Sequence, residues 1–174
     1  MEENKIKTGS FALTYGLILG AISVVFALML YSADLHYKGG VMVGVVSMAI
    51  TLILIVFGIY QFKKANNGFL TFGQGLKVGV GISLIGGIVG ILFNLLMSNV
   101  IDPEMMTKAL EFQKGELLAN TKMTPEQVDS QLEMGKKFST PTMQVLFGLL
   151  FSIVLGFVFS LIPALALKKE EILN

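Results

Sequence analysis

The sequence predicts an all-α fold, a bundle of four transmembrane helices with a helical extracytoplasmic loop between the third and the fourth. Two observations predict it. The chain is 53% hydrophobic with a mean hydropathy of +0.73, which is far more apolar than an ordinary soluble domain. In addition, no charged residue occurs within residues 8–33, 39–62, 78–101 or 138–167.

Each charge-free segment is long enough for one crossing, because about 20 apolar residues in a helix span the ~30 Å bilayer core. The segments are too long for barrel strands. We expect one membrane domain, residues 1–174, with spans at about 11–33, 40–62, 78–101 and 142–167. Four amphipathic soluble helices are the weaker alternative, because residues 50–59 have no polar face.

The first span could be mistaken for a signal peptide, since Lys5 and Lys7 precede it. Its apolar run is longer than the ~7–15 residues of the apolar h-region of a signal peptide, so we expect it to remain in the membrane. The chain has no arginine, and its lysines set the orientation. The second loop contains Lys63, Lys64 and Lys77 and no acidic residue. By the positive-inside rule this loop and both termini are cytoplasmic, and the long third loop lies outside.

The long loop, residues 102–141, is predicted to hold two short helices. Asp102-Pro103 and Thr124-Pro125 each pair a capping residue with proline at the first helical position. These signals predict helices at about 103–119 and 125–138. An apolar stripe on the first, which includes Met106, could dock a partner, lie on the membrane surface or simply pack the connection.

Small residues recur at a spacing of four in every span, a pattern that lets membrane helices approach closely. The fourth span has Gly148, Ser152, Gly156, Ser160 and Ala164. The other sets are Ala12, Gly16 and Gly20; Gly40 and Gly44; Gly75, Gly79, Ser83 and Gly87; and Gly86, Gly90, Asn94 and Ser98. The pattern indicates close packing, either within one chain or between chains.

Two polar or irregular positions inside the spans are candidates for function. Asn94 is the most polar residue of the third span. It could line a solute path, but we expect it to form a hydrogen bond to a neighbouring helix. Pro163 frees the carbonyl of Phe159, so it should kink the fourth helix, and Ser160 could satisfy that carbonyl. The kink could serve as a gating hinge or be purely structural.

We predict no catalytic, cofactor-binding or metal-binding residue. His36 is the sole histidine and there is no cysteine, whereas a metal site needs three or four ligands. We expect His36 to be a solvated loop residue. An enzyme would have to use Asp102, Glu104 or His36 at the outer surface. The net charge of +1 indicates no nucleic-acid partner.

The second loop carries the most distinctive motif. Residues 67–77 read Asn-Gly-Phe-Leu-Thr-Phe-Gly-Gln-Gly-Leu-Lys, with an Asn-Gly turn signal at Gly68, aromatic anchors at Phe69 and Phe72, and Gly73 between capping residues. This stretch, followed by Asp102-Pro103 after the third span, resembles an uncharacterised bacterial membrane-protein family, domain of unknown function 4199. The resemblance implies a four-helix inner-membrane protein and implies no activity, ligand or catalytic residue.

The absence of charge within the spans bears on function, because proton relays, ion-coupled transporters and voltage sensors place ionisable residues at membrane depth. The first hypothesis is a non-enzymatic component that acts in the bilayer through contacts with a second copy or another membrane protein. The alternative is a small carrier or channel-like protein for an uncharged solute. The two differ in whether Asn94 and the span serines line one cavity or lie in dry helix contacts.

Overall fold

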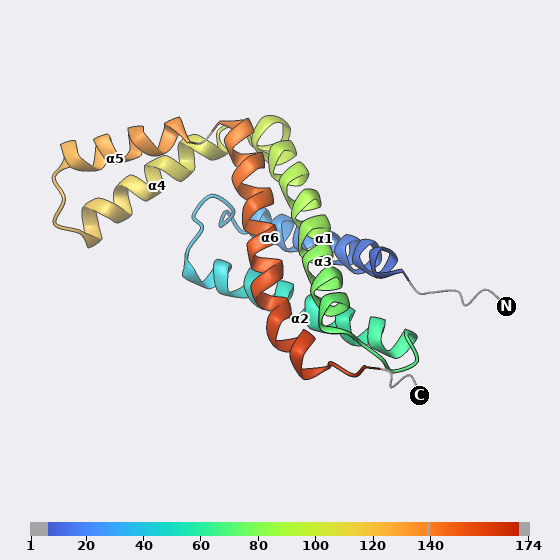
Figure 1. The fold of residues 1–174 in the computed structure, drawn as a ribbon. Coiled ribbons are helices and arrows are strands. Elements are labelled where there is room, and N and C mark those ends of the chain that lie inside the picture. The colour runs from blue at the N-terminus through green and yellow to red at the C-terminus, as the bar shows by residue number, and fades with distance from the viewer. Residues whose placement is uncertain (1–6, 139, 171–174) are drawn as a thin grey trace.

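The structure is a computed structural model that describes residues 7–138 and 140–170. Its helices are α1 (Thr8–Ser32), α2 (Val41–Ala65), α3 (Phe72–Leu96), the short π-helix η1 (Met97–Ile101), α4 (Met105–Asn120), α5 (Pro125–Lys137) and α6 (Pro141–Ala166) (Figure 1). Four segments, α1, α2, α3 with η1, and α6, are long and apolar enough to cross a membrane. The predicted all-α class is therefore confirmed.

Hydrogen bonds from side chains determine where several helices begin. Thr71 accepts from the backbone N–H of Gln74, and the Gln74 side chain accepts from the Thr71 N–H, so α3 begins at Phe72 with a complete capping box. Thr124 starts α5 in the same way. The prediction for α4 was wrong by one half-turn, because α4 begins at Met105 and the Asp102 side chain does not cap it.

The tightly packed core lies at one end of the four spans, where α1 and α3 begin and α2 and α6 end. Its buried members include Leu19, Ile55, Ile59, Phe62, Leu70, Val78 and Ile82. At the opposite end the helices are less covered by one another, and Val41 and Met42 at the start of α2 are 86% and 75% exposed. Apolar side chains of this kind are left for lipid to cover.

α3 and α6 pack antiparallel through their small residues. A Cβ built on Gly156 would lie 2.7 Å from Ser83 Cβ and 3.0 Å from Val80 Cα. The other facing pairs are Gly75 with Ala164, Gly79 with Ser160, and Gly87 with Ser152. The fourth-span stripe thus faces a matching stripe of the same chain, and both backbones approach closely because neither has bulky side chains there.

α3 also packs against α1, so it lies between α1 and α6 (Figure 1). Ile85 and Val89 of α3 pack against Gly16 and Gly20 of α1, respectively. The pair at the start of α2 behaves differently, since a Cβ built on Gly40 or on Gly44 would meet nothing within 4 Å. The small-residue pattern there does not mark a helix contact within this chain.

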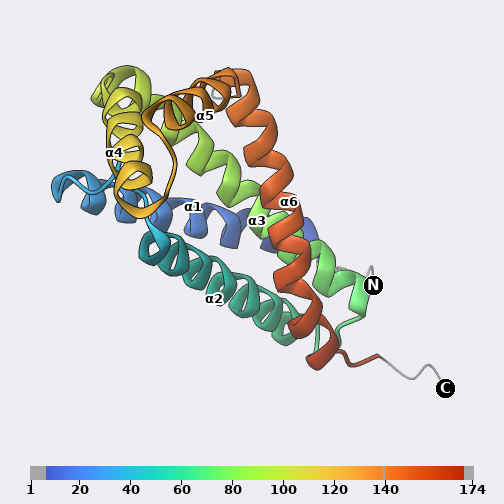
Figure 2. The same cartoon turned by 90° about the vertical axis from the view of Figure 1, so that its left-hand side faces the viewer.

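α4 and α5 form an antiparallel hairpin that projects sideways from the end of α3 and α6 (Figures 1 and 2). We call this hairpin, Met105–Lys137, the arm. Among the described elements α4 contacts α5 and η1, and α5 contacts α4 alone. Val128 and Leu132 of α5 are buried in the hairpin. The arm is folded on itself and does not cover the end of the spans.

Candidate functional site

The motif in the second loop folds into a tight turn. Asn67 (φ 53°) and Gly68 (φ 82°) both have left-handed backbone conformations, which explains the Asn-Gly pair, because few other residues adopt them without strain. The Gly68 N–H donates to the Lys63 carbonyl (2.9 Å), and the Phe69 N–H donates to the Asn66 carbonyl (2.9 Å). These bonds reverse the chain between α2 and α3.

The same turn joins the loop to the segment after α6. Leu70 and Lys169 exchange two backbone hydrogen bonds of 2.8 and 2.9 Å, and the Leu70 side chain is fully buried. The Lys169 ammonium lies 5.5 Å from the centre of the Phe69 ring, which is a cation–π distance. Phe72 is half-buried and Gly73 is exposed. The motif therefore closes one end of the spans and is structural.

A buried polar cluster lies at the opposite end, and we call it the His36 cluster. His36 Nε2 lies 2.9 Å from Asp102 Oδ2, and the Lys108 ammonium lies 2.9 Å from Asp102 Oδ1. The side chains of His36 and Asp102 are only 6% and 8% exposed. The expectation that His36 is solvated was wrong, because the first loop folds over the end of α3.

Several elements together position the His36 cluster. The π turn of η1 ends with the Asp102 N–H donating to the Met97 carbonyl (2.8 Å), so Asp102 leaves the helix at an angle that an α-turn would not give. Pro103 is exposed in the turn that follows. On the other side, the rings of Tyr31 and Tyr37 contact the His36 ring edge to face, at 4.9 and 5.1 Å.

The hydrogen bond from His36 and the ammonium of Lys108 hold the pKa of Asp102 below its ordinary value of 3.8, and Asp102 in turn raises the pKa of Lys108. Asp102 is therefore a carboxylate at neutral pH and can only accept hydrogen bonds. His36 Nε2 must carry the proton that it shares with Asp102. Nδ1 is buried and has no partner among the described residues, so a neutral ring leaves a lone pair there.

A cavity of about 140 Å³ lies between α1 and α3 beside the His36 cluster. We call it the α1–α3 cavity. It is lined by Ser23, Val24, Ala27, Leu30, His36, Gly90, Phe93, Asn94, Met97 and Met105. Apart from the histidine, its polar lining residues are Ser23 and Asn94. Within residues 7–138 and 140–170, neither of these side chains forms a hydrogen bond.

Asn94 was expected to bond to a neighbouring helix, and the structure does not support this. Asn94 is exposed on α3, where it lines the α1–α3 cavity and also a more open groove between α3 and α6. Neighbouring Gly90 lines both spaces, and a Cβ built on it would meet nothing within 4 Å. At this depth α1 and α6 lie farther from α3, so no side chain of a neighbouring helix is within hydrogen-bond distance of the Asn94 amide.

Three other span serines, Ser83, Ser152 and Ser160, lie at the α3–α6 contact, whereas Ser47 is exposed on α2 and donates to the Val43 carbonyl. Ser83 donates to the Ser152 carbonyl (2.8 Å) across the α3–α6 contact, and Ser152 donates to the Gly148 carbonyl (2.8 Å). Ser160 donates to the Gly156 carbonyl, so it does not serve the Phe159 carbonyl that Pro163 frees. α6 continues through Pro163, which is buried, to Ala166.

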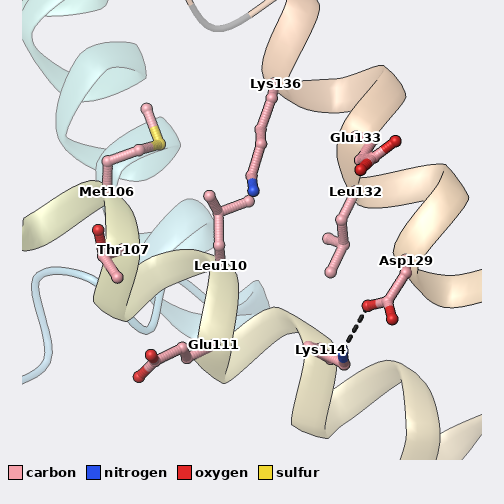
Figure 3. Close-up of a pocket in the computed structure, with 9 residues that line it drawn as sticks. All are labelled: Met106, Thr107, Leu110, Glu111, Lys114, Asp129, Leu132, Glu133 and Lys136. Atoms are coloured by element: carbon pink, nitrogen blue, oxygen red, sulfur yellow. Dashed lines mark ion pairs between the residues drawn. The ribbon is translucent and has the colours of Figure 1, made fainter. Parts of the chain in front are cut away.

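The arm carries a groove of about 610 Å³ between α4 and α5 (Figure 3). Leu110 of α4 and Leu132 of α5 line it from the two helices, and an ion pair joins Lys114 to Asp129 at one end. Glu133 and Lys136 add further charges to its lining. The groove mixes apolar and charged groups of both signs, which is typical of a surface exposed to water.

The chemistry available to these sites is limited. Among the described residues, His36 bonds to Asp102 alone, so no hydroxyl or amine is held as a nucleophile for it. In the same part of the chain, no group of three or more His, Asp or Glu side chains could hold a metal ion. Sequence reasoning did not find the pairing of His36 with Asp102, because no local signal links residues in separate loops.

Comparison with known proteins gives one match. A family described as "Protein of unknown function (DUF4199)" matches residues 14–169. No curated protein and no solved structure matches the chain.

Proposed function

We propose that this chain, which belongs to the DUF4199 family of proteins of unknown function, is a membrane component without catalytic activity that acts through contacts with other membrane proteins. The arm is the observation that carries this proposal. It is a folded hairpin that is attached to the rest of the described chain only at its base, where α4 contacts η1, Lys108 pairs with Asp102, and Met105 lines the α1–α3 cavity. A surface left free by its own chain is available to a partner.

The use of small and polar residues within the spans supports the same proposal. The small-residue stripes of α3 and α6 pack against each other. At this contact Ser83, Ser152 and Ser160 donate hydrogen bonds to backbone carbonyls. Such packing builds a rigid anchor in which Ser83 and Ser160 are buried, while Ser152 lies at the edge of the groove that Asn94 also lines. The partner contact is therefore assigned to the arm, with a second copy of this chain or another membrane protein as the partner.

The proposed location is the inner membrane of a bacterium, with both termini in the cytoplasm and the arm outside. The lysines of the second loop support this orientation, since the loop has three lysines and no acid. The proposal of no enzyme activity rests on His36, which is directed to Asp102 and holds no nucleophile. No cofactor, metal or nucleic acid is part of the proposal.

The alternative, a carrier for an uncharged solute, is favoured by one observation, the exposure of Asn94 to two spaces on α3. A carrier needs polar groups along the whole path. The serines nearer the core are occupied in the α3–α6 contact, so the first proposal fits more of the polar residues.

Site-specific photo-crosslinking in native membranes tests the proposal. A photoreactive amino acid replaces Met134 on the arm, which is 61% exposed, and in the control it replaces Val158 on α6, which is 51% exposed. We expect protein adducts of discrete mass from Met134 and only lipid adducts from Val158. The carrier hypothesis replaces this proposal if proteoliposomes show saturable uptake of an uncharged solute that Asn94→Leu abolishes, with no protein adduct from the arm.

A further inference from the structure

We propose that the α1–α3 cavity binds a neutral hydroxyl group attached to an apolar body. This site does not rest on the proposed function, and of the arm only Met105, at its base, lines it. It combines a cavity, two polar side chains without partners and a wall of apolar residues. Each of these observations narrows the chemistry of the ligand.

The size and lining of the cavity define the apolar part of the ligand. A volume of about 140 Å³ is close to the ~150 Å³ of an apolar protein cavity that accommodates benzene. Most of the lining consists of Val24, Ala27, Leu30, Phe93, Met97 and Met105. An apolar body of about six carbon atoms would fill this space.

Ser23 and Asn94 define the polar part. They come from α1 and α3 and line the same cavity, and among the described residues neither side chain has a hydrogen-bond partner. A hydroxyl oxygen can accept from the Asn94 amide N–H and donate its own hydrogen to a side-chain oxygen of Ser23 or Asn94. An unpaired amide in an apolar surrounding is costly, so such a group would be bound in preference to a hydrocarbon.

The charges near the cavity exclude an ionic ligand. The lining of the cavity contains no aspartate, glutamate or lysine, and the nearby Asp102 and Lys108 are paired with each other. No carboxylate or ammonium of the lining could therefore balance a ligand ion, and burying an unpaired ion is strongly unfavourable. The ligand is therefore a free alcohol or the uncharged hydroxyl end of a lipid such as a diacylglycerol.

Gly90 offers a way to close the cavity without disturbing the helices. A Cβ at this position would meet nothing within 4 Å, and the residue lines the cavity, so Gly90→Leu fills the ligand space. Gly44→Leu is the matched control, because a Cβ there also meets nothing within 4 Å and Gly44 lies on α2, away from the cavity. Equal melting temperatures of the two variants and the wild type establish that all are folded.

The probe is hexanol carrying a photoreactive diazirine, applied to the purified full chain in detergent, with its methyl ether and its parent hydrocarbon as comparison probes. We expect saturable labelling of α1 and α3 near residues 23–30 and 90–97. The alcohol should label at a roughly fivefold lower concentration than the ether, which lacks one hydrogen bond. Gly90→Leu and Asn94→Leu should reduce labelling at least fivefold, and Gly44→Leu should leave it unchanged.

A second experiment uses lipid vesicles that contain a photoreactive diacylglycerol or its acetylated form. Selective labelling by the free hydroxyl form identifies a lipid as a ligand, whereas labelling by hexanol alone identifies a small alcohol. Equal labelling by alcohol, ether and hydrocarbon overturns the proposal, because it would reflect partition into an apolar groove. Labelling that survives Gly90→Leu also overturns it, since the ligand would then lie elsewhere.

Discussion

At the scale of single residues, the His36 cluster shows how burial changes the role of an ordinary loop residue. One carboxylate, Asp102, receives a hydrogen bond from His36 and an ion pair from Lys108, and both acceptor oxygens are thereby used. The three residues come from the α1–α2 loop, the turn after η1 and α4. The cluster therefore joins the first loop to the base of the arm.

The first prediction concerns the pH dependence of this cluster. Because the folded pKa of Asp102 lies below its ordinary value of 3.8, the ionised carboxylate stabilises the fold at every pH above that value. This contribution is lost as the pH falls below 3.8 toward the folded pKa. Asp102→Asn should lower the melting temperature by a few degrees at pH 7, and the difference from wild type should narrow only below about pH 4.

The control for this prediction is Glu104→Gln. Its side chain is 81% exposed and its nearest oxygen lies 3.9 Å from the Lys108 ammonium, and exposed pairs of this kind contribute little to stability. Thermal unfolding in detergent from pH 3 to pH 8 measures both variants. If the difference in melting temperature between Asp102→Asn and wild type already narrows between pH 7 and pH 5, the ionisation of Asp102 is not its cause.

At the scale of helices, the small-residue contact between α3 and α6 determines how closely the spans pack. A leucine at Gly156 would place side-chain atoms where Ser83 and the Val80 backbone already lie. Neither neighbour can yield easily, because one is backbone and the other is buried in the same contact. The two helices would have to separate along much of their length.

The second prediction follows from this geometry. Gly156→Leu should lower the free energy of unfolding by about 1–3 kcal/mol, the usual cost of overpacking. Val158→Leu on the lipid-facing side, where the residue is 51% exposed, should change it by less than about 0.5 kcal/mol. Thermal melting in detergent measures both. Indistinguishable melting temperatures would mean that the α6 stripe does not form the contact.

The predictable part of the fold is local. Apolar segments located the spans, and the capping boxes at Thr71 and Thr124 located the starts of α3 and α5, because these signals depend on residues close in sequence. The partners of His36 and Asn94 depend on how the helices separate at one end. His36 meets a residue 66 positions away. Asn94 meets none among the described residues, although its spacing from Gly90 and Ser98 fits a helix contact.

At the scale of the whole molecule, the core and the turn closed by Leu70 and Lys169 lie at one end, and the His36 cluster and the arm lie at the other. The two ends therefore differ in packing and in charge. Because the two ends differ, the orientation of the chain in the bilayer determines whether the arm lies inside or outside the cell.

The third prediction concerns that orientation. The chain has no cysteine, so single cysteines report on each side without background. Ala65→Cys lies at the end of α2 and Ser130→Cys lies on the arm, and both positions are exposed. A membrane-impermeant maleimide should label Ser130→Cys in intact cells and Ala65→Cys only after the membrane is opened. The reverse labelling pattern would show that the chain has the opposite topology, with the same four spans.

The contact between α3 and α6 also has a consequence in time. α3 is synthesised first, and its face of Gly75, Gly79, Ser83 and Gly87 has no partner until α6 follows. The arm lies between them, so roughly 70 residues separate the ends of the two helices. At the usual 5–20 residues per second of synthesis, that face is open to lipid for roughly 4–14 s. The arm, Met105–Lys137, supplies about half of these residues, so a shorter arm would shorten the time for which the α3 face lacks its partner.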